Sequence, residues 1–209
     1  MRRYQILFFL ISSCLLLSGC AVKTVKGFEQ QAPAVTNYPV TYFSDAKTDY
    51  VYKAHIAIYG RDFGGIFIAK KINDTLYRAA FTTEFGNKLF DFEITDTSFK
   101  VNYILEELDK ALIVNTLKRD FMLLLKQNHA VQEQYKDNQN TVYKSDAGKR
   151  SNYLFIDKTS GQLAKIVNAT KSKEKTIISY TPQSNILAKN IVIEHKNIKL
   201  KIELNYLEQ

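Results

Sequence analysis

The sequence predicts a mainly β fold, in which a curled antiparallel sheet or open half-barrel is covered by one or more helices. First, about ten short runs after residue 49 alternate apolar and polar side chains with the period of two that strands require. Second, the first five runs are joined by only a few residues, which suits antiparallel neighbours because parallel strands need long crossovers. Third, residues 108–127 carry apolar side chains at helical spacing. A sheet of so many strands must curl or close.

The strands of the first half are expected over residues 50–59, 64–72, 75–82, 88–95 and 98–104. Their alternation separates an apolar inner face from a polar outer face, on which Asp91 and Glu93 lie. The inner face is expected to include Tyr52, Ala54, Ile56, Ile58, Phe90, Phe92, Ile94, Phe99, Val101 and Tyr103.

The helix over residues 108–127 has a wide apolar stripe that includes Leu117 and Phe121, and Lys118 and Arg119 lie on its polar side. We expect it to cover the concave face of the sheet, either as packed core or as a lid over a cavity. A loop is expected over residues 127–140. Strands then resume over residues 152–157, 162–170, 175–181, 187–195 and 198–207.

The N-terminus is typical of a secretory signal: Arg2 and Arg3 precede an apolar run over residues 4–17 that is too short to span a membrane comfortably. Small residues then precede a cysteine in Leu17-Ser18-Gly19-Cys20, as in the lipobox of bacterial lipoproteins. Residues 1–19 are therefore predicted to be a lipoprotein signal peptide, and Cys20 to carry diacylglycerol and an amide-linked acyl chain such as palmitate. The alternative is an ordinary signal peptide with an incidental cysteine. Ala21, not Asp, follows Cys20, which favours the outer membrane in a Gram-negative cell.

Residues 20–48 are polar, contain Pro33 and Pro39 and show no sustained period, so we expect a lipid-anchored flexible tether there. Residues 49–209 then form a single β-rich half-barrel domain. The only cysteines are Cys14 and Cys20, so processing leaves no thiol for a disulfide. The formal net charge of +8 suits a position near an anionic membrane, or simply a solvated basic surface.

No set of residues predicts catalysis, a cofactor or a metal site. His55, His129 and His195 lie in three separate segments without metal-ligand spacing, two of them on strands, and we expect exposed histidines without a metal. The carboxylates cluster on a strand face and at a helix start, where both have structural explanations. No nucleophile elbow or phosphate-binding glycine loop is present. No basic reading helix is present either, so a nucleic-acid partner is not expected.

The segment "FTTEFGNKLF", residues 81–90, predicts a hairpin whose tip carries Phe85 directly before Gly86. A large apolar ring is unusual in a turn. It either folds back onto the sheet beside Phe81 or Phe90, or is held out toward another molecule.

Two stretches, "YRAAFTTEFGNKLFDFEI" and "LAKNIVIEHKNIKLKIELNYL", together with the order of elements, resemble the LolA/LolB family of lipoprotein carriers and receptors. The resemblance covers roughly residues 51–206. It implies an open β-barrel that is plugged by helices and receives acyl chains in its interior. It also implies that Phe85 and Gly86 match the hairpin tip at which the family's receptor carries an exposed leucine for membrane insertion, with Glu84 where the family has proline.

The sequence thus predicts a non-enzymatic, outer-membrane-anchored monomer that binds acyl chains, and to which a periplasmic carrier delivers lipoproteins. Cys20 would contact membrane lipid. A cavity for the cargo would be lined by Ile56, Ile58, Phe90, Phe92, Phe99, Leu117 and Phe121. The alternative is an anchored structural or interaction protein with the same fold and a solid core.

Overall fold

The computed structural model describes residues 23–208 of the 209-residue chain. The predictions for the signal peptide and for Cys20 fall outside these residues. The described chain begins with a short 3-10 helix, η1 (Lys23–Val25), and contains one α-helix, α2 (Ala111–Leu124). No helix between residues 23 and 208 has the length and apolar character needed to cross a membrane.

One large antiparallel sheet of 13 strands dominates the fold. Its order from edge to edge is β1 (Glu29–Gln31), β9 (Glu133–Lys136), β10 (Asn140–Ala147), β11 (Arg150–Asp157), β12 (Leu163–Ala169), β13 (Glu174–Pro182), β14 (Ala188–His195), β15 (Leu200–Tyr206), β3 (Asp49–Ile58), β4 (Arg61–Lys71), β5 (Tyr77–Thr82), β6 (Lys88–Ile94) and β7 (Phe99–Ile104). A second sheet pairs β2 (Asn37–Pro39) with β8 (Asn128–Ala130). The last strand, β15, lies beside β3 and joins the two halves of the large sheet.

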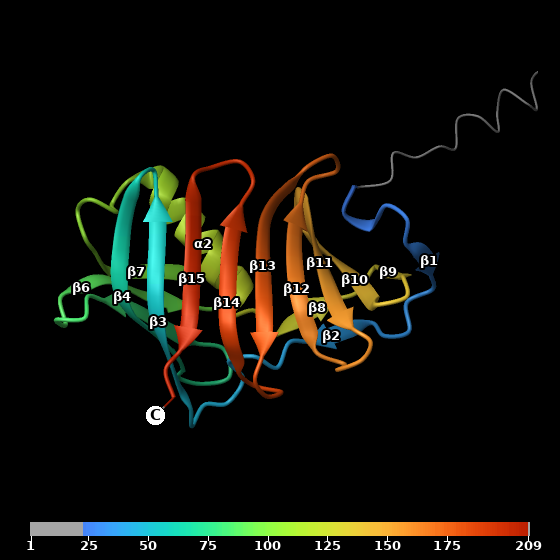
Figure 1. The fold of residues 1–209 in the computed structure, drawn as a ribbon, viewed down its shortest axis with the longest axis horizontal. Coiled ribbons are helices and arrows are strands. Elements are labelled where there is room, and N and C mark those ends of the chain that lie inside the picture. Colours follow the sequence, from blue (N-terminus) through green and yellow to red (C-terminus); the bar gives the residue numbers. More distant parts are fainter. Residues whose placement is uncertain (1–22, 209) are drawn as a thin grey trace, which may run out of the picture.

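The sheet curls, and α2 lies against one of its faces, behind β14 and β15 in the view of Figure 1. The helix buries Ile113, Leu117, Phe121 and Leu124 in the core that it shares with the sheet. The predicted fold class, a curled antiparallel sheet covered by a helix, is confirmed.

Period-two alternation explains the central strands. Along β3 the side chains of Tyr50, Tyr52, Ala54, Ile56 and Ile58 are all buried, and the residues between them are more exposed. The neighbouring β15 alternates in the same way, and its register sets Ile202 opposite Ile56. The inner faces of the two strands therefore meet in one core.

Strand β7 differs from its prediction. Val101 and Tyr103, which were expected on the inner face, are 39% and 42% exposed. This strand is an edge of the large sheet, and the register between β6 and β7 shifts at Asp91/Phe92. The shift sets Tyr103 opposite Asp91 on the outer face, whereas Val101 stays opposite Phe92 and is exposed at the uncovered edge.

The prediction of a flexible tether over residues 20–48 is wrong for residues 23–48, which are part of the folded domain. There β1 pairs with β9 and β2 pairs with β8, and Val40, Tyr42 and Phe43 are almost completely buried. The Tyr42 hydroxyl donates a hydrogen bond to the carbonyl of Leu163 at 3.0 Å. Main-chain pairing needs no hydrophobic alternation, so these short polar strands left no period in the sequence.

The prediction of a loop over residues 127–140 is also wrong where this segment forms strands. Strands β8 and β9 lie within it, and β10 begins at its end. They receive the N-terminal segment, since β8 pairs with β2 and β9 pairs with β1. A second apolar cluster lies on the other face of β10–β12 and is formed by Val25, Val142, Tyr153, Phe155, Val167 and Ala169, with Phe28 packed against it.

Candidate functional site

The β5–β6 hairpin presents Phe85 to solvent. The ring is 94% exposed, whereas Phe81 and Phe90 below it are fully buried. Gly86 has a φ of +84°, a backbone conformation that glycine adopts without strain. The main-chain N–H of Gly86 donates to the carbonyl of Thr83 at 2.9 Å, and the N–H of Thr83 donates to the carbonyl of Asn87 at 2.8 Å. The tip is thus a closed turn that holds the ring outward.

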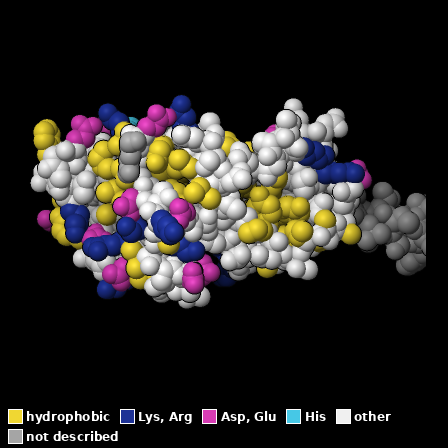
Figure 2. All heavy atoms as spheres, turned by 90° about the horizontal axis from the view of Figure 1, so that it is seen from below, with side chains coloured by type: hydrophobic (Ala, Val, Ile, Leu, Met, Phe, Trp, Pro, Cys, Tyr) yellow, Lys and Arg dark blue, Asp and Glu magenta, His cyan; other side chains and the backbone are white. Residues whose placement is uncertain are grey.

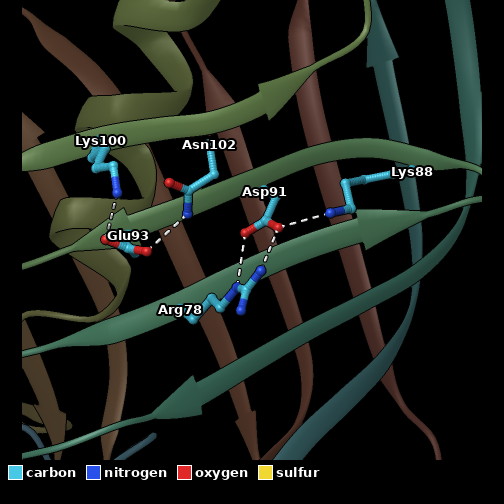
Figure 3. Close-up of polar contacts among 6 residues, drawn as sticks. All are labelled: Arg78, Lys88, Asp91, Glu93, Lys100 and Asn102. Carbon is cyan, nitrogen blue, oxygen red and sulfur yellow. Dashed lines mark hydrogen bonds and ion pairs between the residues drawn. The ribbon is translucent and has the colours of Figure 1, made fainter.

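Charged side chains on the outer face brace the base of this hairpin (Figure 3). Asp91 of β6 accepts hydrogen bonds from Arg78 of β5 at 3.0 and 2.7 Å and from Lys88 at 2.9 Å. Glu93 of the same strand accepts from Asn102 of β7 at 3.0 Å and pairs with Lys100. Three adjacent strands are therefore tied together beneath the tip.

Asp91 was expected to be solvated on the outer face, but its side chain is only 2% exposed. Hydrogen bonds from the Arg78 guanidinium hold the pKa of this carboxyl well below its usual range, although burial acts in the opposite direction. Charge-assisted hydrogen bonds of this kind are about twice as strong as neutral ones. Asp91 is therefore an ionised anchor of the hairpin.

The residues predicted to line a cavity come together beneath α2 as a packed aromatic core. The ring of Phe121 stacks on Phe67 with centroids 5.2 Å apart, and lies 5.4 Å from Phe90 and 6.2 Å from Phe92. The predicted set is buried except for Phe99, which is half-buried and lies 4.7 Å from Phe92. These rings therefore pack against one another between α2 and the sheet.

A small opening lies where the start of α2 meets the β3–β4 hairpin. Its volume is about 270 Å³, and its apolar lining includes Ile58, Tyr59, Phe63, Leu112 and Ile113. Tyr59 and Leu112 are half exposed there. The opening joins the surface to Ile58, one of the predicted cavity residues.

The structure corrects the expectation that the histidines are exposed. His129 on β8 is fully buried, and neither ring nitrogen has a hydrogen-bond partner among residues 23–208. Its burial, with the charge of Lys126 as a smaller cause, lowers the pKa of His129 to about 4. The side chain of His195 is 4% exposed and lies 2.8 Å from Asp120 of α2. Only His55 is substantially exposed, between Asp62 and Glu203.

Burial raises the pKa of Asp120, with the contact to His195 acting against it. The sequence did not predict this pair, because Asp120 and His195 are 75 residues apart and each lies in a segment with the pattern of an ordinary helix or strand.

In the part of the chain that the structure describes, no three His, Cys, Asp or Glu residues group closely enough to hold a metal ion. On the face shown in Figure 2, basic and acidic side chains are interspersed.

No family model matches the chain, and no curated protein matches it. Solved structures that are similar to it include the following two. One is a LolA superfamily protein from Nitrosomonas europaea, with 8% identity and a TM-score of 0.48 over 78% of this chain and 86% of that one. The other is a putative outer membrane lipoprotein-sorting protein domain from Vibrio parahaemolyticus, with 8% identity and a TM-score of 0.45 over 77% of this chain and 83% of that one. Nothing about the activity of this chain follows from likenesses at this level.

Proposed function

We propose that this protein is anchored in the outer membrane through Cys20 and receives the acyl chains of lipoproteins from a periplasmic carrier. The observation that carries the proposal is Phe85, an almost completely exposed aromatic ring on a braced hairpin. A ring held in this way has no role in the core, and an apolar surface such as a lipid would bury it favourably.

The interior supplies the second half of the proposal. Each buried CH₂ group of an acyl chain contributes about 0.8 kcal/mol, so one chain is enough for reversible binding. Phe121 packs against Phe67, Phe90 and Phe92 between α2 and the sheet, so the proposed binding includes a movement of α2 away from these rings. The N-terminal end of the helix suits this motion, since Lys110 at its N-cap position makes no side-chain capping bond and Leu112 is half exposed. The opening at Tyr59 and Leu112 is where access would begin.

The role of Phe85 is tested by Phe85→Glu in an assay that follows a fluorescent acylated peptide from the protein into liposomes. We expect the variant to keep its melting temperature and to lose most of the transfer, because a carboxylate at the tip resists entering lipid. The matched control is Ile72→Glu, which adds the same charge at another exposed apolar side chain, 48% accessible, after β4. Transfer by Phe85→Glu at the wild-type rate would overturn the proposal.

The packing of Phe121 on Phe67 and Phe90 beneath α2 favours a second candidate, an anchored interaction protein without a ligand cavity. Uptake of a fluorescent fatty acid by the Cys20→Ala chain distinguishes the two, because that chain carries no acyl group of its own. Saturable uptake supports the acyl-chain function. Absence of uptake, together with protein partners recovered by crosslinking in membranes, would support the interaction protein.

A further inference from the structure

A row of polar side chains crosses one end of the concave face. Backbone register places Ser145 opposite Asn152, Asn152 opposite Asn168, Asn168 opposite Thr176, and Thr176 opposite His195. Directly opposite residues point to the same side of a sheet, so these five residues form one continuous band over β10–β14, which we call the polar row. The rest of this face is mostly apolar core, so a band of polar groups there needs an explanation.

The polar row is joined by hydrogen bonds and extended by charged neighbours. The Asn168 amide donates to Asn152 at 2.7 Å, and the Arg150 guanidinium donates to the Asn168 carbonyl oxygen at 3.0 Å. Thr176 lies 3.2 Å from Nδ1 of His195, whose Nε2 contacts Asp120. One N–H group of Arg150 bonds to the polar row, and the guanidinium has further N–H groups that can donate to a ligand.

A pocket of about 240 Å³ opens over this row, beneath the C-terminal half of α2. Three cations line it: Arg119 and Lys126 from the helix side and Arg150 from β11. Across residues 23–208, none of the three lies within ion-pair distance of a carboxylate. Arg119 donates to the Thr116 hydroxyl at 3.0 Å.

The electrostatics of this pocket favour an anion. Partial burial and the nearby charge of Arg119 lower the pKa of Arg150, and the charge of Asp120 acts in the opposite direction. Two carboxylates also face it. Asp120 is engaged by His195, and Asp96 lies exposed at the rim. An anion between the two arginines would offset their mutual repulsion, whereas Asp96 and any negative charge on Asp120 would oppose it, and the three cations outnumber these two carboxylates.

We infer that this pocket binds a phosphate group through Arg119, Arg150 and Lys126, with the amides of Asn152 and Asn168 at its floor. Guanidinium groups present paired donors that match phosphate oxygens, and a phosphate has enough acceptors for several cations at once. The volume is below the roughly 300–1,000 Å³ of sites that enclose drug-sized ligands, which suits a small anion or a headgroup. This inference does not depend on Phe85 or on acyl binding beneath α2.

The test is calorimetric titration of the full chain in detergent with inorganic phosphate and, separately, with dihexanoyl phosphatidic acid. Dihexanoylglycerol, which lacks the phosphate, measures the contribution of the short acyl chains. We expect Arg150→Gln and Arg119→Gln each to weaken binding of the phosphate compound about tenfold or more, because each removes a charge-assisted hydrogen-bond donor. The controls Lys149→Gln and Lys118→Gln remove the same charge one residue away and outside the pocket lining, and should bind as the wild type does.

Two results support the inference and identify the source of the phosphate. Tighter binding of the lipid than of inorganic phosphate identifies a headgroup, and equal or weaker binding identifies a free phosphate. Two results would overturn it: a wild-type chain that binds neither compound, or control variants that weaken binding as much as the arginine variants do. Arg119 is exposed, so its variant remains informative even if Arg150→Gln fails to fold.

Discussion

Asp91 shows how a single side chain stabilises the candidate site. We expect Asp91→Asn to lower the free energy of unfolding at pH 7 by about 2 kcal/mol, because it loses the charge that Arg78 and Lys88 surround. The pKa of Asp91 is depressed in the folded state, so its stabilisation is complete above the ordinary value of about 3.9 and fades as the pH falls below it.

Urea denaturation of both proteins at pH 7 and at pH 3 measures this effect. The difference between wild type and Asp91→Asn should narrow at pH 3. The neighbouring variant Glu93→Gln serves as the control and should change stability less, since Glu93 is more exposed. A gap between wild type and Asp91→Asn that stays constant over this range would contradict the ionised anchor.

His129 makes the opposite kind of contribution, since burial keeps it neutral. Its folded-state pKa of about 4 lies below the ordinary value of about 6.5, so the unfolded chain binds the proton first as the pH falls. Stability is therefore complete above pH 6.5 and decreases by about 3 kcal/mol as the pH approaches 4.

We expect His129→Leu to remove most of this decrease. At pH 7.5 its stability should stay close to that of the wild type, because a buried ring without hydrogen-bond partners gives way to an apolar group. Urea titrations of the wild type and the variant at pH 7.5 and 4.5 measure the change. A leucine variant as pH-sensitive as the wild type would rule out His129 as the cause.

At the scale of elements, the close approach of β4 and β5 depends on one of two adjacent glycines. A Cβ on Gly65 would lie 1.9 Å from the Thr82 carbonyl oxygen, whereas a Cβ on Gly64 would meet nothing within 4 Å. We expect Gly65→Ala to cost about 2 kcal/mol or more, because a backbone oxygen cannot rotate away. Thermal unfolding should show a much smaller effect for Gly64→Ala, and equal melting temperatures for the two variants would contradict this packing.

The sequence predicts correctly those elements whose pattern lies within one continuous segment. Strands such as β3 and β15 alternate along their whole length, and the turn before Gly86 placed Phe85 at a tip. Strands β1, β2, β8 and β9 have only three or four residues and pair through the main chain, which has no hydrophobic period. The polar row could not be predicted either, because its members are aligned by the register between strands and not by the sequence of any one strand.

At the scale of the whole molecule, the order of strands places the N-terminal segment and the Phe85 hairpin near opposite edges of the large sheet. Strand β1 forms one edge of the large sheet, and the β5–β6 hairpin lies next to the other edge (Figure 1). Only Ala21 and Val22 separate Cys20 from Lys23, where the described fold begins. If Cys20 carries the proposed lipid anchor, we expect the β1 edge to lie nearer to it than the Phe85 hairpin does.

The N-terminal segment is part of the fold, so removing it should cost more than losing a tether would. A chain that begins at Thr48 lacks β1, β2 and the buried side chains of Val40, Tyr42 and Phe43. Burial of one such side chain is worth about 1.5–3 kcal/mol, so the three together approach the 5–15 kcal/mol that separates a typical folded domain from its unfolded state.

Urea unfolding followed by circular dichroism compares this truncated chain with one that begins at Lys23, which keeps every described element. We expect the longer chain to unfold cooperatively, and the shorter one to be unfolded or to unfold at a much lower urea concentration. The truncation also uncovers the second apolar cluster, because Val25 and Phe28 no longer pack on β10–β12. Equal midpoints for the two chains would mean that residues 23–47 contribute nothing to stability, as a true tether would.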